Sequence, residues 1–273
     1  MAKLTKAQSA AQKHVETLLA QDILSVEDRA YVLTHYHEAA HNNVTPSGAF
    51  FTPLALAMEF AEYCSLPNRQ GKVRILDLCA GIGALSFAMQ QRFADSPFAE
   101  SCDITCIEIN GEYVQVGKKL VPEAHWLQMD ICDIDALLAL GQFDVVISNP
   151  PFGNVTTFKG KSGVCYTGSN AIYKAAELAA MLAPSATFIM PQKEAGFKYS
   201  GEDTFSTMPN DALAAFSAQT GIAFSPNNFS GTHLYEQQWK AKVPRVEFAE
   251  CDFSEECVTA SVTTAPVQSD LFG

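Results

Sequence analysis

Strand-like apolar runs alternate with helical runs between residues 73 and 190, and this alternation constrains the fold more than any other feature. Short apolar runs predict strands, and apolar residues repeating every three or four positions predict helices. The predicted strands are 73–79, 102–108, 124–129, 143–148 and 186–190, and the predicted helices are 84–94, 112–120, 134–140 and 171–182. Such alternation is typical of parallel strands with helices on both faces. It predicts a doubly wound, Rossmann-like α/β fold with a mostly parallel sheet.

The chain has 273 residues, 48% of them hydrophobic, enough for one α/β domain with short additions at its ends. Helical spacing over 4–21 and 26–41 predicts an N-terminal helical arm, residues 1–45. A turn-rich loop over 42–53 and a helix over 54–63 open the main domain, residues 46–253. Its last part is predicted as a loop over 192–208, a helix over 210–219 and a hairpin over 235–253 that completes the sheet. Residues 254–273 hold few large apolar side chains, which predicts a flexible tail.

The sequence carries no sign of a membrane or an oxidising compartment. No run approaches the roughly 20 apolar residues that a membrane-crossing helix needs, and the first residues have no signal-peptide core. The eight cysteines are irregularly spaced, and Cys79 and Cys106 lie within apolar runs. Buried free thiols of this kind are expected in a reducing compartment. We therefore expect a cytoplasmic protein with no membrane partner.

The first predicted strand leads into a glycine turn, Asp77-Leu78-Cys79-Ala80-Gly81-Ile82-Gly83, and a helix follows. Glycines here remove the Cβ atoms that would keep a ligand away from the backbone. The third glycine of the dinucleotide fingerprint is missing, so a nicotinamide cofactor is disfavoured. An ordinary tight turn would also explain the motif, and the turn alone does not decide between the two.

Acidic residues follow the next two predicted strands. Glu108 stands where such folds hold the two hydroxyls of a ribose, and the Asp130 carboxylate is placed to accept a hydrogen bond from an adenine amino group. Solvated charges at strand ends are the alternative. Together with the glycine turn, the two acids predict a cleft for a cofactor that contains adenosine.

The fourth predicted strand ends in Ser148-Asn149-Pro150-Pro151-Phe152-Gly153. Successive prolines fix φ and remove two backbone donors, so the turn presents carbonyl oxygens and the Asn149 side chain in a rigid arrangement. Such a turn suits an amino group, and Phe152 offers a flat face for a purine or pyrimidine ring. A plain proline turn is the alternative.

With these motifs in this order, the chain resembles the amino-group DNA methyltransferases, especially the catalytic core of the modification subunits of type I restriction systems. The resemblance covers roughly residues 46–191 and rests on the segments 48–53 (Gly-Ala-Phe-Phe-Thr-Pro), 77–83 and 149–153. It implies the class I methyltransferase fold, S-adenosylmethionine as cofactor, and methyl transfer to N6 of an adenine flipped out of double-stranded DNA. The cofactor-binding residues that it implies are Phe51, Thr52, Pro53, Asp77, Ala80, Gly81, Gly83, Glu108, Asp130 and Asn149. Its implied catalytic residues are Asn149, Pro150, Pro151 and Phe152.

Two further motifs have competing interpretations. His37-Glu38-Ala39-Ala40-His41 matches the H-E-x-x-H zinc pattern, but a short arm helix and a different downstream cofactor favour ordinary exposed or packing histidines, with no metal. Residues 153–170, rich in glycine and containing Lys159 and Lys161, suit a loop that closes over a flipped nucleotide. A long disordered connection is the alternative for that loop.

The net charge of −12 argues against unaided DNA binding, which depends on lysine and arginine neutralising phosphates. Gln268, Leu271 and Phe272 resemble the short peptide by which bacterial proteins dock on the replication sliding clamp, which would raise the local DNA concentration. The 192–243 region is small for target reading, so either the target is very short or loosely read, or a specificity subunit is a further partner. RNA and protein glutamine are alternative substrates, and a non-catalytic subunit that docks through its tail is the alternative from another class.

Overall fold

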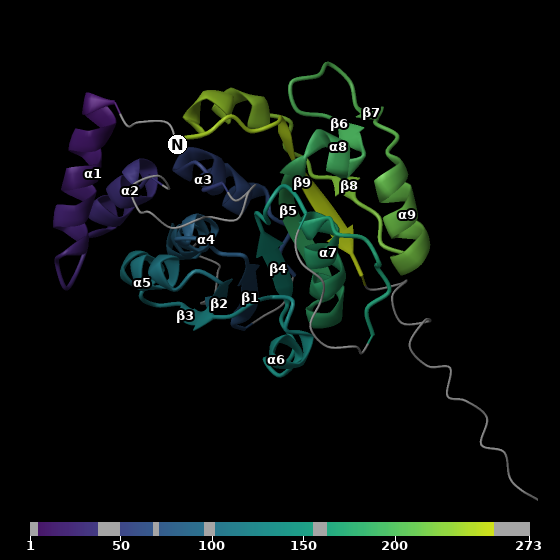
Figure 1. Ribbon diagram of the computed structural model, residues 1–273, viewed down its shortest axis with the longest axis horizontal. Helices are drawn as coiled ribbons and strands as arrows, with labels where there is room; N and C mark the ends of the chain where they lie inside the picture. Colours follow the sequence, from purple (N-terminus) through teal and green to yellow (C-terminus); the bar gives the residue numbers. More distant parts are fainter. Residues whose placement is uncertain (1–4, 38–49, 68–70, 96–101, 155–162, 254–273) are drawn as a thin grey trace, which may run out of the picture.

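The computed structural model describes residues 5–37, 50–67, 71–95, 102–154 and 163–253. Within this part, the main sheet contains β1 (Val73–Leu78), β2 (Cys102–Glu108), β3 (His125–Gln128), β4 (Val145–Ser148), β5 (Ser185–Pro191), β8 (Ser225–Pro226) and β9 (Val246–Asp252). Their order is β3-β2-β1-β4-β5-β9-β8. Strands β1 to β5 are parallel, and β9 pairs antiparallel with both β5 and β8. The predicted doubly wound, mostly parallel sheet is confirmed (Figure 1).

The helices of the described chain are α1 (Lys6–Leu19), α2 (Val26–His35), α3 (Leu54–Tyr63), α4 (Ala84–Asp95), α5 (Gly111–Leu120), α6 (Ile134–Leu138), α7 (Ala171–Leu182), α8 (Gln192–Ala195) and α9 (Asp211–Thr220). A 3-10 helix, η2 (Thr232–Gln238), and a small sheet of β6 (Phe197–Lys198) and β7 (Ser206–Thr207) complete the set. In the described part, no helix combines the length and apolar character needed to cross a membrane.

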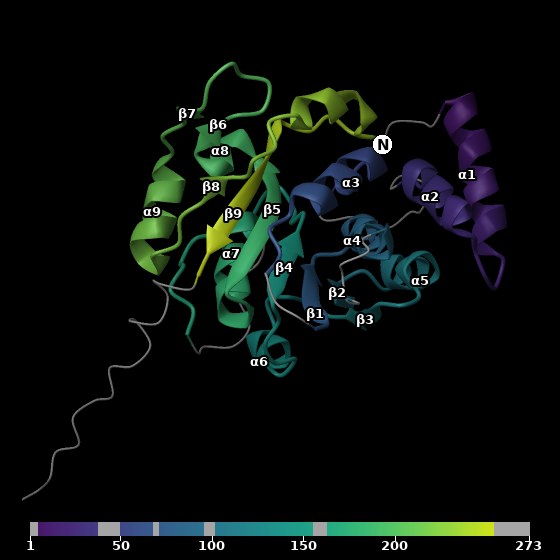
Figure 2. The same cartoon turned by 180° about the vertical axis from the view of Figure 1, so that it is seen from behind.

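Two hydrophobic cores lie on opposite faces of the sheet, because successive side chains of a strand point to opposite sides. Ile75 packs into a core shared with α1 to α5, and its neighbour Leu76 packs into a core shared with α6, α7 and α9. Seen from behind in Figure 2, β5 and β9 lie in front of α7. Burial on both faces explains why the central strands β4 and β5 are almost continuously apolar.

The N-terminal helices pack against the domain beside α5, and both views place α1 and α2 at this end of the molecule. Lys119 on α5 donates from Nζ to the carbonyl oxygens of Leu19 (2.6 Å) and Gln21 (2.9 Å), just after α1. Tyr36 follows α2, and its buried ring contacts the rings of Phe51 and Tyr113 at centroid distances of 5.8 and 6.4 Å. The arm therefore supports the segment that precedes α3.

The structure corrects the sequence-based expectation for residues 192–253. The expected loop over 192–208 contains α8 and the β6–β7 hairpin. The hairpin expected over 235–253 does not form: residues 232–238 form η2, and β9 pairs with β5 and with the upstream β8. Glu247 of β9 is fully buried and accepts hydrogen bonds from Gln192 and from the backbone of Tyr199 and Ser200, contacts between distant residues that local periodicity does not encode.

Candidate active site

The strand order reverses between β1 and β4, which are hydrogen-bonded neighbours. In open α/β sheets, ligands bind beyond the carboxyl ends of the strands at such a point. A cavity of about 340 Å³ lies there. Its lining residues include Phe50, Phe51, Cys79, Gly81, Glu108, Ile109, Asn110, Tyr113, Met129, Asp130, Cys132, Asn149, Pro151 and Asn154. The fold thus brings the predicted acids and Asn149 together at the carboxyl ends of β2, β3 and β4.

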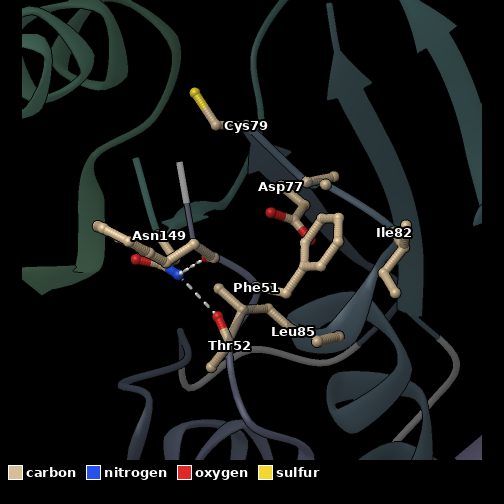
Figure 3. A pocket seen from close by; sticks show the side chains of 11 residues that line it. Phe51, Thr52, Asp77, Cys79, Ile82, Leu85 and Asn149 are labelled. Atoms are coloured by element: carbon tan, nitrogen blue, oxygen red, sulfur yellow. Dashed lines mark hydrogen bonds between the residues drawn. The ribbon is translucent and has the colours of Figure 1, made fainter. Parts of the chain in front are cut away.

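A smaller cavity of about 30 Å³ adjoins the large one and shares Phe51, Gly81 and Asn149 with it. Thr52 and Asp77 also line it (Figure 3). The two cavities offer a wide apolar space beside a narrow one that contains the polar side chains of Thr52, Asp77 and Asn149. This combination suits a ligand with a flat ring at one end and a small charged group at the other.

The glycine turn is held open by its own backbone contacts. Gly81 has a positive φ of 57°, and a Cβ atom there would lie 3.3 Å from the Phe51 ring. The Gly81 N–H donates to Oε2 of Glu108 at 2.9 Å, which ties the turn to the end of β2. Cys79 also has a positive φ, 77°, a conformation that only glycine adopts without strain. The backbone here is shaped for the ligand cleft and not for local stability.

Asp77 provides a buried acceptor in the small cavity. The residue is 1% exposed; its Oδ2 accepts from the Ser86 hydroxyl at 2.6 Å, and its Oδ1 accepts no hydrogen bond from the described residues. Burial, with a smaller contribution from the nearby charge of Glu108, raises the pKa of Asp77 to about 7. A buried carboxylate with an unpaired oxygen suits an ammonium group such as that of an amino acid.

The large cavity suits an adenosine. Oε1 of Glu108 accepts from the Asn110 N–H at 2.8 Å, and each oxygen of this carboxylate keeps a further lone pair for ribose hydroxyls. Burial raises the pKa of Glu108. Asp130 accepts from the Cys132 N–H at 3.0 Å and lines the same cavity. Ile109 lines it too and is 54% exposed, so it offers an apolar surface that a flat ring would cover.

Asn149 stands between the two cavities. Its Nδ2 donates to the Phe50 carbonyl oxygen at 3.0 Å and to Oγ1 of Thr52 at 2.9 Å. Its Oδ1 is buried and accepts no hydrogen bond from the described residues. Figure 3 shows the nitrogen turned toward Thr52 and the oxygen turned away from it. The side chain therefore presents an acceptor, as the sequence predicted for an amino-group site.

The rest of the Asn-Pro-Pro-Phe turn has mixed placements. Pro151 lines the large cavity. Pro150 is buried and does not line it. Phe152 is half-buried and does not line this cavity either. The centroid of its ring lies 5.7 Å from that of the Phe50 ring, and the two planes are tilted by 51°. Phe152 thus stands beside the cofactor cleft, on a wall that includes Phe50.

Two residues expected at the cofactor lie elsewhere. Pro53 precedes α3 as its N-terminal cap and lines a separate groove together with Leu54 and Met58. Gly83 packs into the core, because a Cβ atom there would lie 3.0 Å from Trp126 and Val121. Ala80 lines the small cavity as expected.

Several lining residues carried no sequence signal that identified them, among them Phe50, Cys79, Ile109, Tyr113 and Asn154. Glu38, His41, the lysines of the expected closing loop and the peptide Gln268, Leu271 and Phe272 lie outside the described residues. In the described chain, no cluster of three or more His, Cys, Asp or Glu side chains could hold a metal ion.

Comparisons with known proteins identify a matching family profile and similar folds. A family profile described as "Methyltransferase small domain" matches residues 64–164, which run from before β1 to beyond the Asn149 turn. The comparison with curated proteins gives no match. A structure from Listeria monocytogenes described as a candidate class I S-adenosylmethionine-dependent methyltransferase is similar, with a TM-score of 0.58 and 15% identity. The alignment covers 97% of this chain and 78% of that one.

Two type I restriction-modification structures are also similar. A modification subunit from Vibrio vulnificus gives a TM-score of 0.52 at 12% identity, over 85% of this chain and 51% of the other. A methyltransferase subunit from Streptococcus thermophilus gives 0.52 at 14% identity, over 87% and 52%. This chain spans about half the length of those subunits.

The sheet order, the cleft and these matches define the class of protein: the fold is that of the class I S-adenosylmethionine-dependent methyltransferases. S-adenosylmethionine is the cofactor that this fold and the family profile imply, and methyltransferase activity is the function they support. The cleft fits that cofactor, because Asp77 offers an unpaired acceptor for its ammonium group while Glu108 and Ile109 suit its adenosine.

Proposed function

We propose that this chain transfers the methyl group of S-adenosylmethionine to N6 of an adenine turned out of double-stranded DNA. The observation that carries the proposal is the buried Oδ1 of Asn149, which accepts no hydrogen bond from the described residues. A buried acceptor without a donor costs free energy, so a donor on a ligand is its natural partner. An exocyclic amino group supplies that donor.

Asp77 and Glu108 would hold S-adenosylmethionine, which when bound would supply an activated methyl group and leave as the neutral thioether, while the amine nitrogen would lose one proton to water. Asn149 Oδ1 and the Pro150 carbonyl oxygen accept the two N–H groups of the amine. Both contacts draw the nitrogen toward tetrahedral geometry and direct its lone pair at the methyl group. Position and fixed dipoles therefore supply the catalysis, and no covalent enzyme intermediate is needed.

The aromatic wall suits a base as the carrier of that amine. Phe152 offers a ring on which the base stacks, and Phe50 supports that ring from 5.7 Å. A base within a duplex cannot reach this wall, so the proposal includes flipping of the adenine. Stacking on an aromatic side chain partly offsets the cost of removing the base from the helix.

The choice of DNA rests on the resemblance of the segments 48–53, 77–83 and 149–153 to DNA methyltransferases, and on the shared fold of the restriction-modification structures. The net charge of −12 requires a second source of DNA affinity. We propose a specificity subunit or the replication sliding clamp, the latter bound through Gln268, Leu271 and Phe272, as that source.

The proposal is tested by incubating the protein and methyl-labelled S-adenosylmethionine in parallel with unmethylated DNA, with RNA and with bacterial proteins. Label is expected in DNA, and mass spectrometry of digested nucleosides should identify N6-methyladenine. Asn149→Ala should lower the transfer rate at least a hundredfold while the calorimetric Kd for S-adenosylmethionine stays within about threefold.

Label in RNA alone, or in glutamine side chains alone, would replace the proposed substrate while keeping the role of Asn149. Undiminished transfer by Asn149→Ala would overturn that role. Cofactor binding without transfer to any polymer would favour the non-catalytic alternative.

A further inference from the structure

The Asn149 amide can act as a catalytic acceptor only if its oxygen, and not its nitrogen, faces the amine. The two ends of an amide have nearly the same size, so packing alone barely distinguishes them. A half-turn of the amide would place Nδ2 against the incoming N–H groups. Contacts in the structure must therefore fix both the plane of this amide and which of its two ends, oxygen or nitrogen, faces the amine.

Both Nδ2 protons of Asn149 are engaged by one short segment, 97 or more residues earlier in the chain. The Phe50 carbonyl oxygen, 3.0 Å away, can only accept, so it would repel Oδ1 in the turned amide. Oγ1 of Thr52, 2.9 Å away, gives the second contact and fixes the plane of the amide. Thr52 is 6% exposed, so water competes little for this hydrogen bond.

We propose that Thr52 is a positioning residue for methyl transfer: with the Phe50 carbonyl, it locks the Asn149 amide with Oδ1 toward the amine. The role goes beyond the cofactor contact that the family resemblance implies for this threonine. It rests on the proposed function, because it concerns the acceptor that the amine would meet. Of the two acceptors that hold the Asn149 amide, Thr52 Oγ1 is the one that a substitution can remove, since the Phe50 carbonyl oxygen belongs to the backbone.

The test compares Thr52→Val with Thr52→Ser. Valine has the shape of threonine but no acceptor, whereas serine keeps the hydroxyl. We expect Thr52→Val to lower kcat about tenfold, with the Kd for S-adenosylmethionine within about threefold of the original chain. Thr52→Ser should restore kcat to within about threefold. Thermal unfolding of each variant shows that it is folded.

A second measurement does not depend on activity. In a ¹⁵N–¹H spectrum, the Asn149 side-chain amide is identified by its loss in Asn149→Ala. Its two protons should exchange slowly with solvent in the original chain and in Thr52→Ser, and at least one should exchange faster in Thr52→Val.

The outcomes separate this proposal from the proposed function. Unchanged amide signals in Thr52→Val would overturn the positioning role. A parallel loss of kcat and cofactor affinity that serine does not rescue would also overturn it, and would make Thr52 a cofactor contact only. If the amide signals respond as expected but no polymer is methylated, the positioning role stands and the proposed function fails.

Discussion

At the scale of single residues, Asp77 links cofactor affinity to pH. Burial raises the pKa of its carboxyl to about 7, so the group is mostly charged at pH 8 and mostly neutral at pH 6. An ammonium ligand binds the charged form of Asp77. At a pH below the pKa, the Asp77 carboxyl must therefore lose its proton before the ligand binds. The Kd for S-adenosylmethionine should therefore rise as pH falls below 7, approaching tenfold per pH unit, as measured by calorimetry between pH 5.5 and 8.5.

Two controls assign this pH dependence to the contact between Asp77 and the ammonium group. Asp77→Asn should bind S-adenosylmethionine weakly at every pH, because it lacks the charge, while Ser86 can still donate to the amide oxygen. Methylthioadenosine, which lacks the amino acid portion, should bind the original chain with a flat profile. A pH-independent Kd for the complete cofactor would contradict this assignment.

At the scale of elements, the sequence predicts best where strands and helices have sharp ends. The predicted 102–108 strand and the 54–63 and 171–182 helices have the bounds of β2, α3 and α7. Asn170 explains one of these starts, since its side chain accepts from the N–H groups of Ile172 and Tyr173. Between 192 and 253 the predicted 210–219 helix is present as α9, but the predicted loop over 192–208 and hairpin over 235–253 were wrong, because pairing of β9 with β5 depends on contacts between distant residues, which local periodicity does not encode.

In the candidate site, too, some features could be predicted from the sequence and others could not. Glu108, Asp130 and Asn149 could be predicted because the carboxyl ends of parallel strands meet at one edge of the sheet. The contact of Asn149 with Thr52 could not, since it joins residues 97 positions apart through a single hydrogen bond. The packing of Gly83 against Trp126 could not be predicted either, because the sequence does not show whether a glycine leaves room for a ligand or for a neighbouring side chain.

The contact between α5 and α1 leads to a prediction about stability. Lys119 donates to the carbonyl oxygens of Leu19, the last residue of α1, and of Gln21, in the region where a helix leaves carbonyl groups unpaired. Lys119→Met should lower the free energy of unfolding by about 1–2 kcal/mol, measured by urea denaturation. The neighbouring Lys118 is exposed, so Lys118→Met makes the same chemical change as a matched control and should shift stability by less than about 0.5 kcal/mol. Equal effects of the two substitutions would contradict this role of Lys119.

At the scale of the whole molecule, charge and the proposed substrate are in tension. A chain with a net charge of −12 repels a polyanion, and its DNA affinity should fall steeply with any loss of its cationic contacts. Tethering changes this balance without adding a contact to DNA, because it converts binding from solution into an encounter at high local concentration. The proposed clamp peptide would act in this way.

A chain that ends at Phe253 tests the tether, together with a full-length Leu271→Ala, Phe272→Ala variant. On circular DNA loaded with a sliding clamp, both should show a KM for DNA at least tenfold above that of the original chain. Without the clamp, all three proteins should have the same kcat and KM, because we propose that the altered residues act through the clamp alone. Retention of the clamp-dependent KM by the double variant would exclude Leu271 and Phe272 as anchors. A loss of kcat without the clamp would show instead that residues 254–273 contribute to the domain itself, which would leave the charge of the chain without this compensation.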